Sequence, residues 1–186
     1  MHTIIPAEKN QVLREIAREV PLGDITGTRI RTLISDMKKL LAQEKYGVAL
    51  AAPQVGDALR LFVISGRALR KHDDEDTDTL ENFSNADLSR VESRDEVYIN
   101  PVMTKVSRRK SDKHEGCLSI RGKWGQVPRA EKATIRAFDE KGRSFTRGAS
   151  GFLAHIFQHE MDHLEGILYT DRAKEMYDEK ENDHEE

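Results

Sequence analysis

Two stretches of the chain show the spacing of apolar residues that is typical of an amphipathic helix. In residues 26–46 the apolar positions recur three or four residues apart and form one stripe, made of Ile30, Leu33, Ile34, Met37, Leu40 and Leu41. A second helix is predicted over Gly151–Leu164, with Ser150 as its N-cap and Gly166 at its end. A weaker helix is expected over residues 11–19, before Pro21.

Short apolar runs between these helices are rich in β-branched and aromatic residues and predict strands. Such runs occupy residues 59–64 and 97–100, and the second is expected to stop at Pro101. Residues 133–138 and 144–148 flank a turn at 139–142 whose late glycine is typical of a β-hairpin. The order of elements predicts an α+β fold with mostly antiparallel sheets around the C-terminal helix and the N-terminal helix packed on the sheet.

Two segments are dominated by acidic residues and lack a clear apolar pattern. Residues 66–96 hold ten acids against five bases, and we interpret them as a solvated insertion or mobile loop. An ordered polar helix is an alternative for part of this segment. The acidic tail, residues 171–186, is expected to be a frayed helix or disordered. The sequence therefore predicts a single domain over residues 1–170, followed by this tail.

The composition narrows the class of protein. Charged residues make up 34% of the 186-residue chain and hydrophobic residues 37%, with a net charge of −3. This balance argues against nucleic-acid binding by bulk attraction, and no apolar run approaches the ~18 residues that cross a bilayer. The start of the chain lacks the apolar core of a signal peptide, and a lone cysteine cannot form an intramolecular disulfide. We therefore expect a cytoplasmic protein without membrane contact.

The helix over residues 151–164 carries the sequence pattern H-E-x-x-H. His159 and His163 are four residues apart, so both rings lie on one face of the helix and can bind one ion. Glu160 lies beside that face, where a carboxylate can act as a base toward an activated water. The same pattern arises by chance on charged helix surfaces. Here the neighbours are apolar, which makes an unpartnered polar cluster costly and favours a metal site.

Two histidines leave the ligand set one short, because catalytic zinc-type sites usually take three protein ligands. Tyr169 stands where one group of hydrolases has a third histidine. Another group uses a downstream glutamate, but Glu175, Glu179 and Glu181 lie in the polar tail. Cys117 offers a thiolate, a strong ligand for zinc or ferrous iron. A buried inert cysteine is the alternative interpretation, and the incomplete histidine pair argues against it.

Three motifs together resemble the signature motifs of peptide deformylases. They are "YGVALAAPQVG" at 46–56, "EGCLS" at 115–119 and "QHEMDH" at 158–163, with weaker similarity in "YINP" at 98–101 and "VPRAEKATI" at 127–135. The resemblance covers residues 13–172, apart from the acidic insertion. It implies that residues 1–170 are a catalytic domain that hydrolyses the formyl group from the N-terminal formylmethionine of newly made polypeptides, releasing formate.

The resemblance also implies roles for individual residues. Cys117, His159 and His163 would bind one divalent metal ion, natively Fe²⁺, with Zn²⁺, Ni²⁺ or Co²⁺ as substitutes. Glu160 would be the general base and would then pass the proton to the departing amine. The Gln54 side chain and the backbone N–H of Leu118 would stabilise the carbonyl oxygen. Nascent polypeptides are the implied partners, and contact with the ribosome is a further expectation.

The pocket for the methionine side chain is expected to be lined by mostly apolar residues. The candidates are Val48, Ala49, Ile99, Trp124, His155 and Ile156. Ala49 stands where a second glycine is usual in the family, and Arg121 replaces a common proline. These departures bear on substrate range and rate more than on the type of reaction.

Two other classes of function stay open at this point. The chain could be an H-E-x-x-H metallopeptidase, which would use a downstream carboxylate ligand and cleave internal peptide bonds. It could instead be a non-enzymatic binding module that a metal ion stabilises.

Overall fold

The computed structural model describes residues 2–73 and 95–178, which form two antiparallel sheets and a few helices. The strands are β1 (Ala49–Ala51), β2 (Leu61–Ile64), β3 (Glu96–Val106), β4 (Lys110–Cys117), β5 (Ile120–Ala130), β6 (Lys132–Phe138), β7 (Ser144–Ser150) and β8 (Glu175–Asp178). The helices are α1 (Thr28–Gln43), α2 (Gly66–Asp73), α3 (Gly151–Leu164) and α4 (Tyr169–Arg172). One sheet has the order β1-β2-β3-β6-β7 and the other β4-β5-β8, which confirms the predicted α+β class.

The five-stranded sheet separates two apolar clusters. Successive side chains of a strand point to opposite faces, so Leu61 and Val63 of β2 pack with α1, while Phe62 and Ile64 pack with α3. The predicted stripe of the first helix faces the sheet with Leu33 and Met37 almost fully buried. The N-terminal helix is therefore packed on the sheet as predicted, with its ends at residues 28 and 43 rather than 26 and 46.

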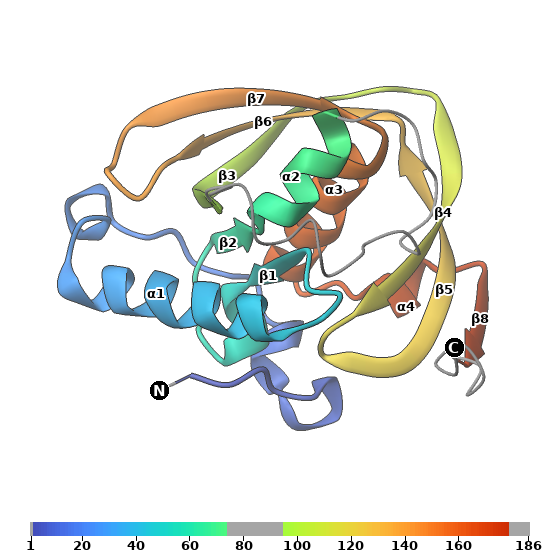
Figure 1. The fold of residues 1–186 in the computed structure, drawn as a ribbon, viewed down its shortest axis with the longest axis horizontal. Helices are drawn as coiled ribbons and strands as arrows, with labels where there is room; N and C mark the ends of the chain where they lie inside the picture. The colour runs from blue at the N-terminus through green and yellow to red at the C-terminus, as the bar shows by residue number, and fades with distance from the viewer. Residues whose placement is uncertain (1, 74–94, 179–186) are drawn as a thin grey trace.

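Helix α3 has the bounds predicted from the sequence and lies in the middle of the molecule (Figure 1). Figure 1 shows β6 and β7 passing over one of its sides, with β4 and β5 at the right and α1 at the lower left. Ser150 occupies the N-cap position, although its side chain makes no capping hydrogen bond. Gly166 has a left-handed φ of 70°, as expected for the glycine after a helix end. This central placement buries the face of α3 that carries the chemistry.

The prediction that a strand stops at Pro101 is wrong, because β3 continues to Val106. The pairing of β3 with β6 shifts register between Ile99 and Val102, and this bulge accommodates a residue that has no N–H to donate. Asn100 takes a left-handed φ of 49° there. Its side-chain amide is held by the backbone of Val20, accepting from the N–H at 2.8 Å and donating to the carbonyl at 2.7 Å.

Three other expectations need correction. Residues 11–19 contain only a 3₁₀ turn at Gln11–Arg14, and the following residues run extended toward Leu164 and Leu59. The interpretation of 66–96 as a loop is wrong for its first residues, which form α2, the polar helix held as an alternative; residues 74–94 lie outside the described residues. The tail is not frayed at residues 175–178, where β8 pairs with β5.

The division into a domain at residues 1–170 and a tail at 171–186 stays a prediction. Within residues 2–73 and 95–178, no helix is long and apolar enough to span a bilayer.

Candidate metal centre

The structure brings together the three residues predicted as metal ligands. Cys117 is the last residue of β4, beside a bulge in its pairing with β5, and His159 and His163 are one turn apart on α3. One ligand atom from each residue lies within 4.8 Å of the others. The Cys117 Sγ and His163 Nε2 atoms are 3.4 Å apart, and the two imidazole rings stand nearly perpendicular at 87°.

These residues fit a divalent cation. Metal–sulfur and metal–nitrogen bonds of about 2.3 and 2.1 Å at a tetrahedral ion separate the two ligand atoms by roughly 3.6 Å, close to the observed distance. Burial lowers the pKa of His163 well below its ordinary value, which favours the neutral ring that a metal ligand needs. Among the described residues, the Glu160 Oε2 and His163 Nδ1 atoms are buried without a hydrogen-bond partner. A polar group bound beside Glu160 at this cluster would offset the cost at Oε2, whereas Nδ1 of His163 is not the ring nitrogen that faces Cys117.

Glu115 sets the orientation of the His159 ring, a role that the sequence analysis missed. Its Oε2 atom lies 2.8 Å from His159 Nδ1, so Nδ1 carries the proton and Nε2 is left for a metal ion. Glu115 was already inside the quoted "EGCLS" motif, two residues before Cys117. The alternation of a strand is the signal that could have found it, because residues 115 and 117 share one face of β4.

The carboxylate of Glu115 belongs to a buried ionic network. Arg129 contacts it with Nε at 2.6 Å and Nη2 at 3.0 Å, and contacts Asp162 with Nη1 at 2.6 Å. Arg172 also contacts Asp162, with Nε 2.8 Å from Oδ2 and Nη2 2.9 Å from Oδ1. Burial alone would raise the pKa of Glu115, but hydrogen bonds from His155, His159 and Arg129 outweigh it and hold that pKa well below its ordinary value. The network therefore keeps a fixed negative charge behind His159.

Gln54 points its amide nitrogen toward the cluster. Its Oε1 atom accepts the backbone N–H of Ala51 at 2.8 Å, which fixes which end of the amide faces inward. Its Nε2 atom lies 3.3 Å from Cys117 Sγ and 3.5 Å from Ser119 Oγ. A preoriented donor of this kind can stabilise negative charge that develops on a nearby oxygen. The small residues before Gln54 let this 3₁₀ turn, Ala52–Val55, pack fully buried.

Glu160 is buried beside the ligands, and its burial raises its pKa to about 7. A carboxyl group with that pKa can both take and release a proton near neutral pH. In protein stripped of metal by a chelator, the raised pKa also has a consequence for stability. The folded state disfavours the charged form, so the carboxylate destabilises the fold as the pH rises from about 4.5 to about 7.

Glu160→Gln is therefore expected to stabilise chelator-treated protein at pH 8 but not at pH 5. The shift of roughly two and a half pKa units corresponds to about 3 kcal/mol at pH 8. Urea unfolding of both proteins with chelator, at the two pH values, measures the difference. An equal difference at pH 5 and pH 8 would contradict the assignment of the raised pKa to this group.

The residues predicted to line a substrate pocket are divided by the sheet. Val48, Ala49 and Ile156 lie in the apolar cluster on the α3 side. Ile99 is fully buried in the cluster on the α1 side, so the structure does not bring it to the metal ligands. Trp124 on β5 is half-buried, and a β-carbon built on Gly116 would come within 3.2 Å of its ring. His155 faces Glu115, with Nε2 2.8 Å from Oε1.

Two further positions bear on the ligand set. Leu118 is half-buried, and its side chain packs against the α1-side cluster. The role of its backbone N–H as a donor stays a prediction. Tyr169, which occupies the place of a third histidine in another hydrolase group, stacks on His159 with the ring centres 6.3 Å apart. Its hydroxyl donates to the Lys123 carbonyl at 2.8 Å. Within the described residues, Cys117, His159 and His163 are the group placed to hold a metal ion.

Comparisons with known proteins agree with this geometry. A family profile described as polypeptide deformylase matches residues 1–179. Peptide deformylase 1A, chloroplastic/mitochondrial, from Arabidopsis thaliana is 37% identical over 174 residues, which are 90% of this chain and 60% of the plant protein. Peptide deformylase 1 from Clostridium perfringens is 37% identical over 162 residues, 87% of this chain and 91% of the bacterial protein.

The fold agrees as well. A crystal structure of a peptide deformylase from Legionella pneumophila superposes with a TM-score of 0.75 and 31% identity, covering 94% of this chain and 86% of that one. The chain spans less than two thirds of the length of the Arabidopsis relative. The profile match, the sequence identity and the shared fold establish that the chain belongs to the polypeptide deformylase family.

Proposed function

We propose that the protein hydrolyses the formyl group from the N-terminal formylmethionine of newly made polypeptides and releases formate. The observation that carries the proposal is the convergence of Cys117, His159 and His163 from β4 and α3, with Glu160 and Gln54 beside them. Cys117, His159 and His163 would hold one divalent cation. When bound, that cation supplies the Lewis acidity that makes water a nucleophile near neutral pH.

The chain's own residues then account for the proton transfers and the charge. Glu160 takes a proton from the attacking water and delivers it to the amine that leaves when the C–N bond breaks. The amide N–H of Gln54, aimed by the N–H of Ala51, donates to the formyl oxygen as negative charge grows there. The backbone N–H of Leu118 is proposed as the second donor. Burial of the site excludes bulk water and strengthens each of these interactions.

The methionine side chain is proposed to lie against the apolar residues beside α3. Val48, directly before β1, and Ala49 and Ile156 share that cluster with the helix that carries the histidines. Trp124 borders Gly116, next to Cys117, and is the proposed contact at the other side. Ile99 was predicted for the same pocket, but its burial on the α1 side gives it no direct part in our proposal.

Formate release by the purified protein tests the proposal. Protein purified without oxygen should bind about one divalent ion per chain and release formate from formyl-Met-Ala-Ser. Cys117→Ala should lose most of the metal and most of the formate release together, because the site would retain only two strong ligands. Metal content is measured by elemental analysis and formate by a coupled dehydrogenase assay.

The metallopeptidase alternative predicts a different outcome. It requires a carboxylate ligand after α3, but Glu175 is exposed on β8, and Glu179 and Glu181 lie outside the described residues. If Cys117→Ala kept its metal and the protein cleaved internal peptide bonds, the deformylase proposal would fail. Tight metal binding without any hydrolysis would instead favour a non-enzymatic binding module.

Iron is proposed as the native metal because the family resemblance implies it; a thiolate with two imidazoles also accepts Zn²⁺, Ni²⁺ or Co²⁺. Elemental analysis of anaerobically purified protein distinguishes these ions. Contact with the ribosome and location in the cytoplasm are further proposals. The curated relatives include a chloroplast and mitochondrial form and a bacterial form, so fractionation of the source cells is the test of location.

A further inference from the structure

His155 occupies an unusual place on the helix that carries the metal ligands. It lies one turn before His159 on α3, and its side chain is only 9% exposed. Its Nε2 atom is 2.8 Å from Oε1 of Glu115, the same carboxylate that contacts His159 through Oε2. An ionised carboxylate only accepts hydrogen bonds, so Nε2 of His155 carries the proton and donates. His155 therefore donates a hydrogen bond to Glu115, the carboxylate that orients the proposed metal ligand His159.

The contact from His155 completes the hydrogen bonding of Glu115. Oε1 accepts from His155 and from Arg129 Nε, and Oε2 accepts from His159 and from Arg129 Nη2. A carboxylate offers about four lone-pair positions, so each is used. Glu115 is almost fully buried, and no water can replace a lost donor without entering the protein interior. Removing the His155 donor would leave one lone-pair position of the buried Oε1 atom unsatisfied, and the carboxylate would then be held only by Arg129 and His159.

The geometry also ties two separate elements together. Glu115 is on β4, two residues before Cys117, while His155 and His159 are on successive turns of α3. The Glu115 carboxylate thus accepts hydrogen bonds from α3 at two residues one turn apart, His155 and His159. This arrangement fixes both the position and the rotation of α3 relative to the strand that carries the thiol.

We propose that His155 is a positioning residue that acts through Glu115 to set the separation between the Cys117 sulfur and the imidazoles of His159 and His163. Its function is then to hold the ligands at the spacing that a metal ion requires. This role differs from the contact with the methionine side chain that the family resemblance implied. The inference rests on the proposed metal centre. It adds that His155, which is not one of the three ligands, affects how tightly the metal ion is held.

Two substitutions separate the positioning role from simple packing. His155→Gln keeps a donor that can reach Glu115, and His155→Leu keeps the volume but removes the donor. Phe157→Leu serves as the matched control, because Phe157 is fully buried on α3 and packs against Tyr98 on the side of the apolar cluster. A general loosening of the helix should affect this control as much as the His155 variants.

The main measurement is the rate at which a chelator removes zinc from the zinc-loaded protein. We expect His155→Leu to lose zinc about 10–100 times faster than the wild type, the range typical of lost outer partners of a ligand. His155→Gln should stay close to the wild type, as should Phe157→Leu. With cobalt bound, the visible ligand-field bands and the near-ultraviolet thiolate-to-cobalt charge-transfer band of His155→Leu should broaden or shift. Its KM for formyl-Met-Ala-Ser should be unchanged in fully loaded protein.

The opposite pattern would overturn the inference. His155→Leu with wild-type zinc release and a raised KM would make this residue a substrate contact. Equal zinc release by His155→Leu and Phe157→Leu would make its effect one of packing, and equally fast release by the glutamine and leucine variants would exclude the donated hydrogen bond. Wild-type protein that takes up no zinc or cobalt would refute the proposed metal centre itself.

Discussion

Glu160→Gln is expected to lower kcat for formate release by about 10³-fold while the metal stays bound. Glutamine keeps the size of the side chain but cannot take a proton from water or return it to the leaving amine. The ligands Cys117, His159 and His163 are unchanged, so elemental analysis should find the same metal content as in the wild type. Formate release from formyl-Met-Ala-Ser under saturating substrate measures kcat directly.

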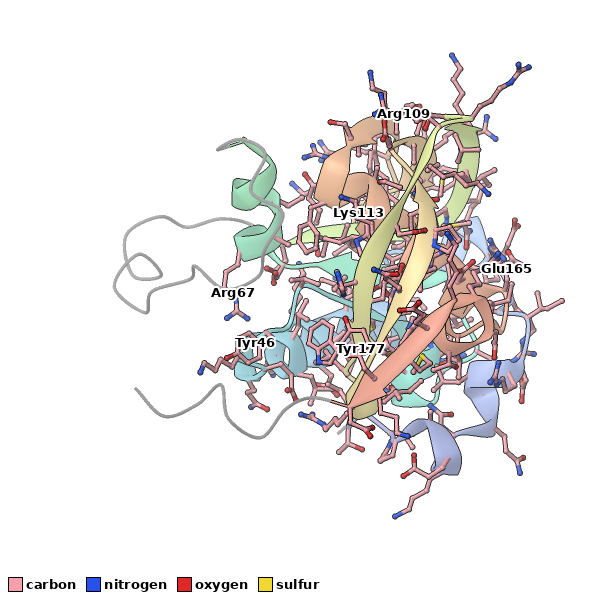
Figure 2. All side chains as sticks on the ribbon, turned by 90° about the vertical axis from the view of Figure 1, so that its right-hand side faces the viewer. Tyr46, Arg67, Arg109, Lys113, Glu165 and Tyr177 are labelled. Carbon is pink, nitrogen blue, oxygen red and sulfur yellow. The ribbon has the colours of Figure 1, made fainter. Side chains whose placement is uncertain are left out.

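Glu165→Gln is the matched control for this experiment. Glu165 directly follows α3, its side chain is 42% exposed, and Figure 2 shows it at the surface of the molecule. The same chemical change there should leave kcat unaltered. Turnover by Glu160→Gln at the wild-type rate would show that another group moves the proton.

The second large effect is expected at Arg129, whose side chain is 5% exposed and whose guanidinium lies between two carboxylates. Arg129→Met should lower the free energy of unfolding by about 3 kcal/mol or more. The substitution removes the positive charge that pairs with the buried carboxylates of Glu115 and Asp162. The residues concerned belong to β4, β5 and α3, so the loss should also weaken metal binding. Urea unfolding of the zinc-loaded proteins measures the change.

Arg109→Met provides the comparison for a salt bridge at the surface. Arg109 lies at the β3–β4 turn (Figure 2). Its side chain is 83% exposed and contacts Glu131 at 3.0 Å. An exposed pair contributes about 0–1 kcal/mol, so this variant should unfold almost like the wild type. Similar losses in the two variants would mean that burial adds nothing to the network around Arg129.

The sequence predicted those parts of the molecule that local patterns determine. Helix α3 has a complete periodic stripe and a glycine after it, and its bounds were correct. The two histidines follow from that helix alone, since residues four apart share a face. Cys117 could be assigned to the same site because it is the chain's lone thiol and the histidine pair lacks a third ligand. The assignment of Cys117 thus rested on the metal-binding chemistry of its thiol, because its distance along the chain from the histidines predicts no contact.

The errors concern features that depend on partners distant in sequence. Pro101 ends a strand only when its missing N–H would face a neighbour, and the bulge opposite β6 removes that requirement. The tail looked disordered because its own residues are polar, yet β8 obtains its hydrogen bonds from the backbone of β5. His155 was placed in a pocket by analogy, while its contact with Glu115 depends on how β4 meets α3.

The pairing of β8 with β5 restricts how this sequence can vary. A β-carbon at Gly125 would come within 2.8 Å of the Met176 sulfur and 2.9 Å of the Ala173 methyl group, although Gly125 does not have a left-handed φ. The need for glycine there arises from crowding by the segment that leads into and forms the last strand. Evolution could accept alanine at 125 only together with a smaller or displaced side chain at 173 or 176. Among homologous sequences that retain this strand, those positions should covary.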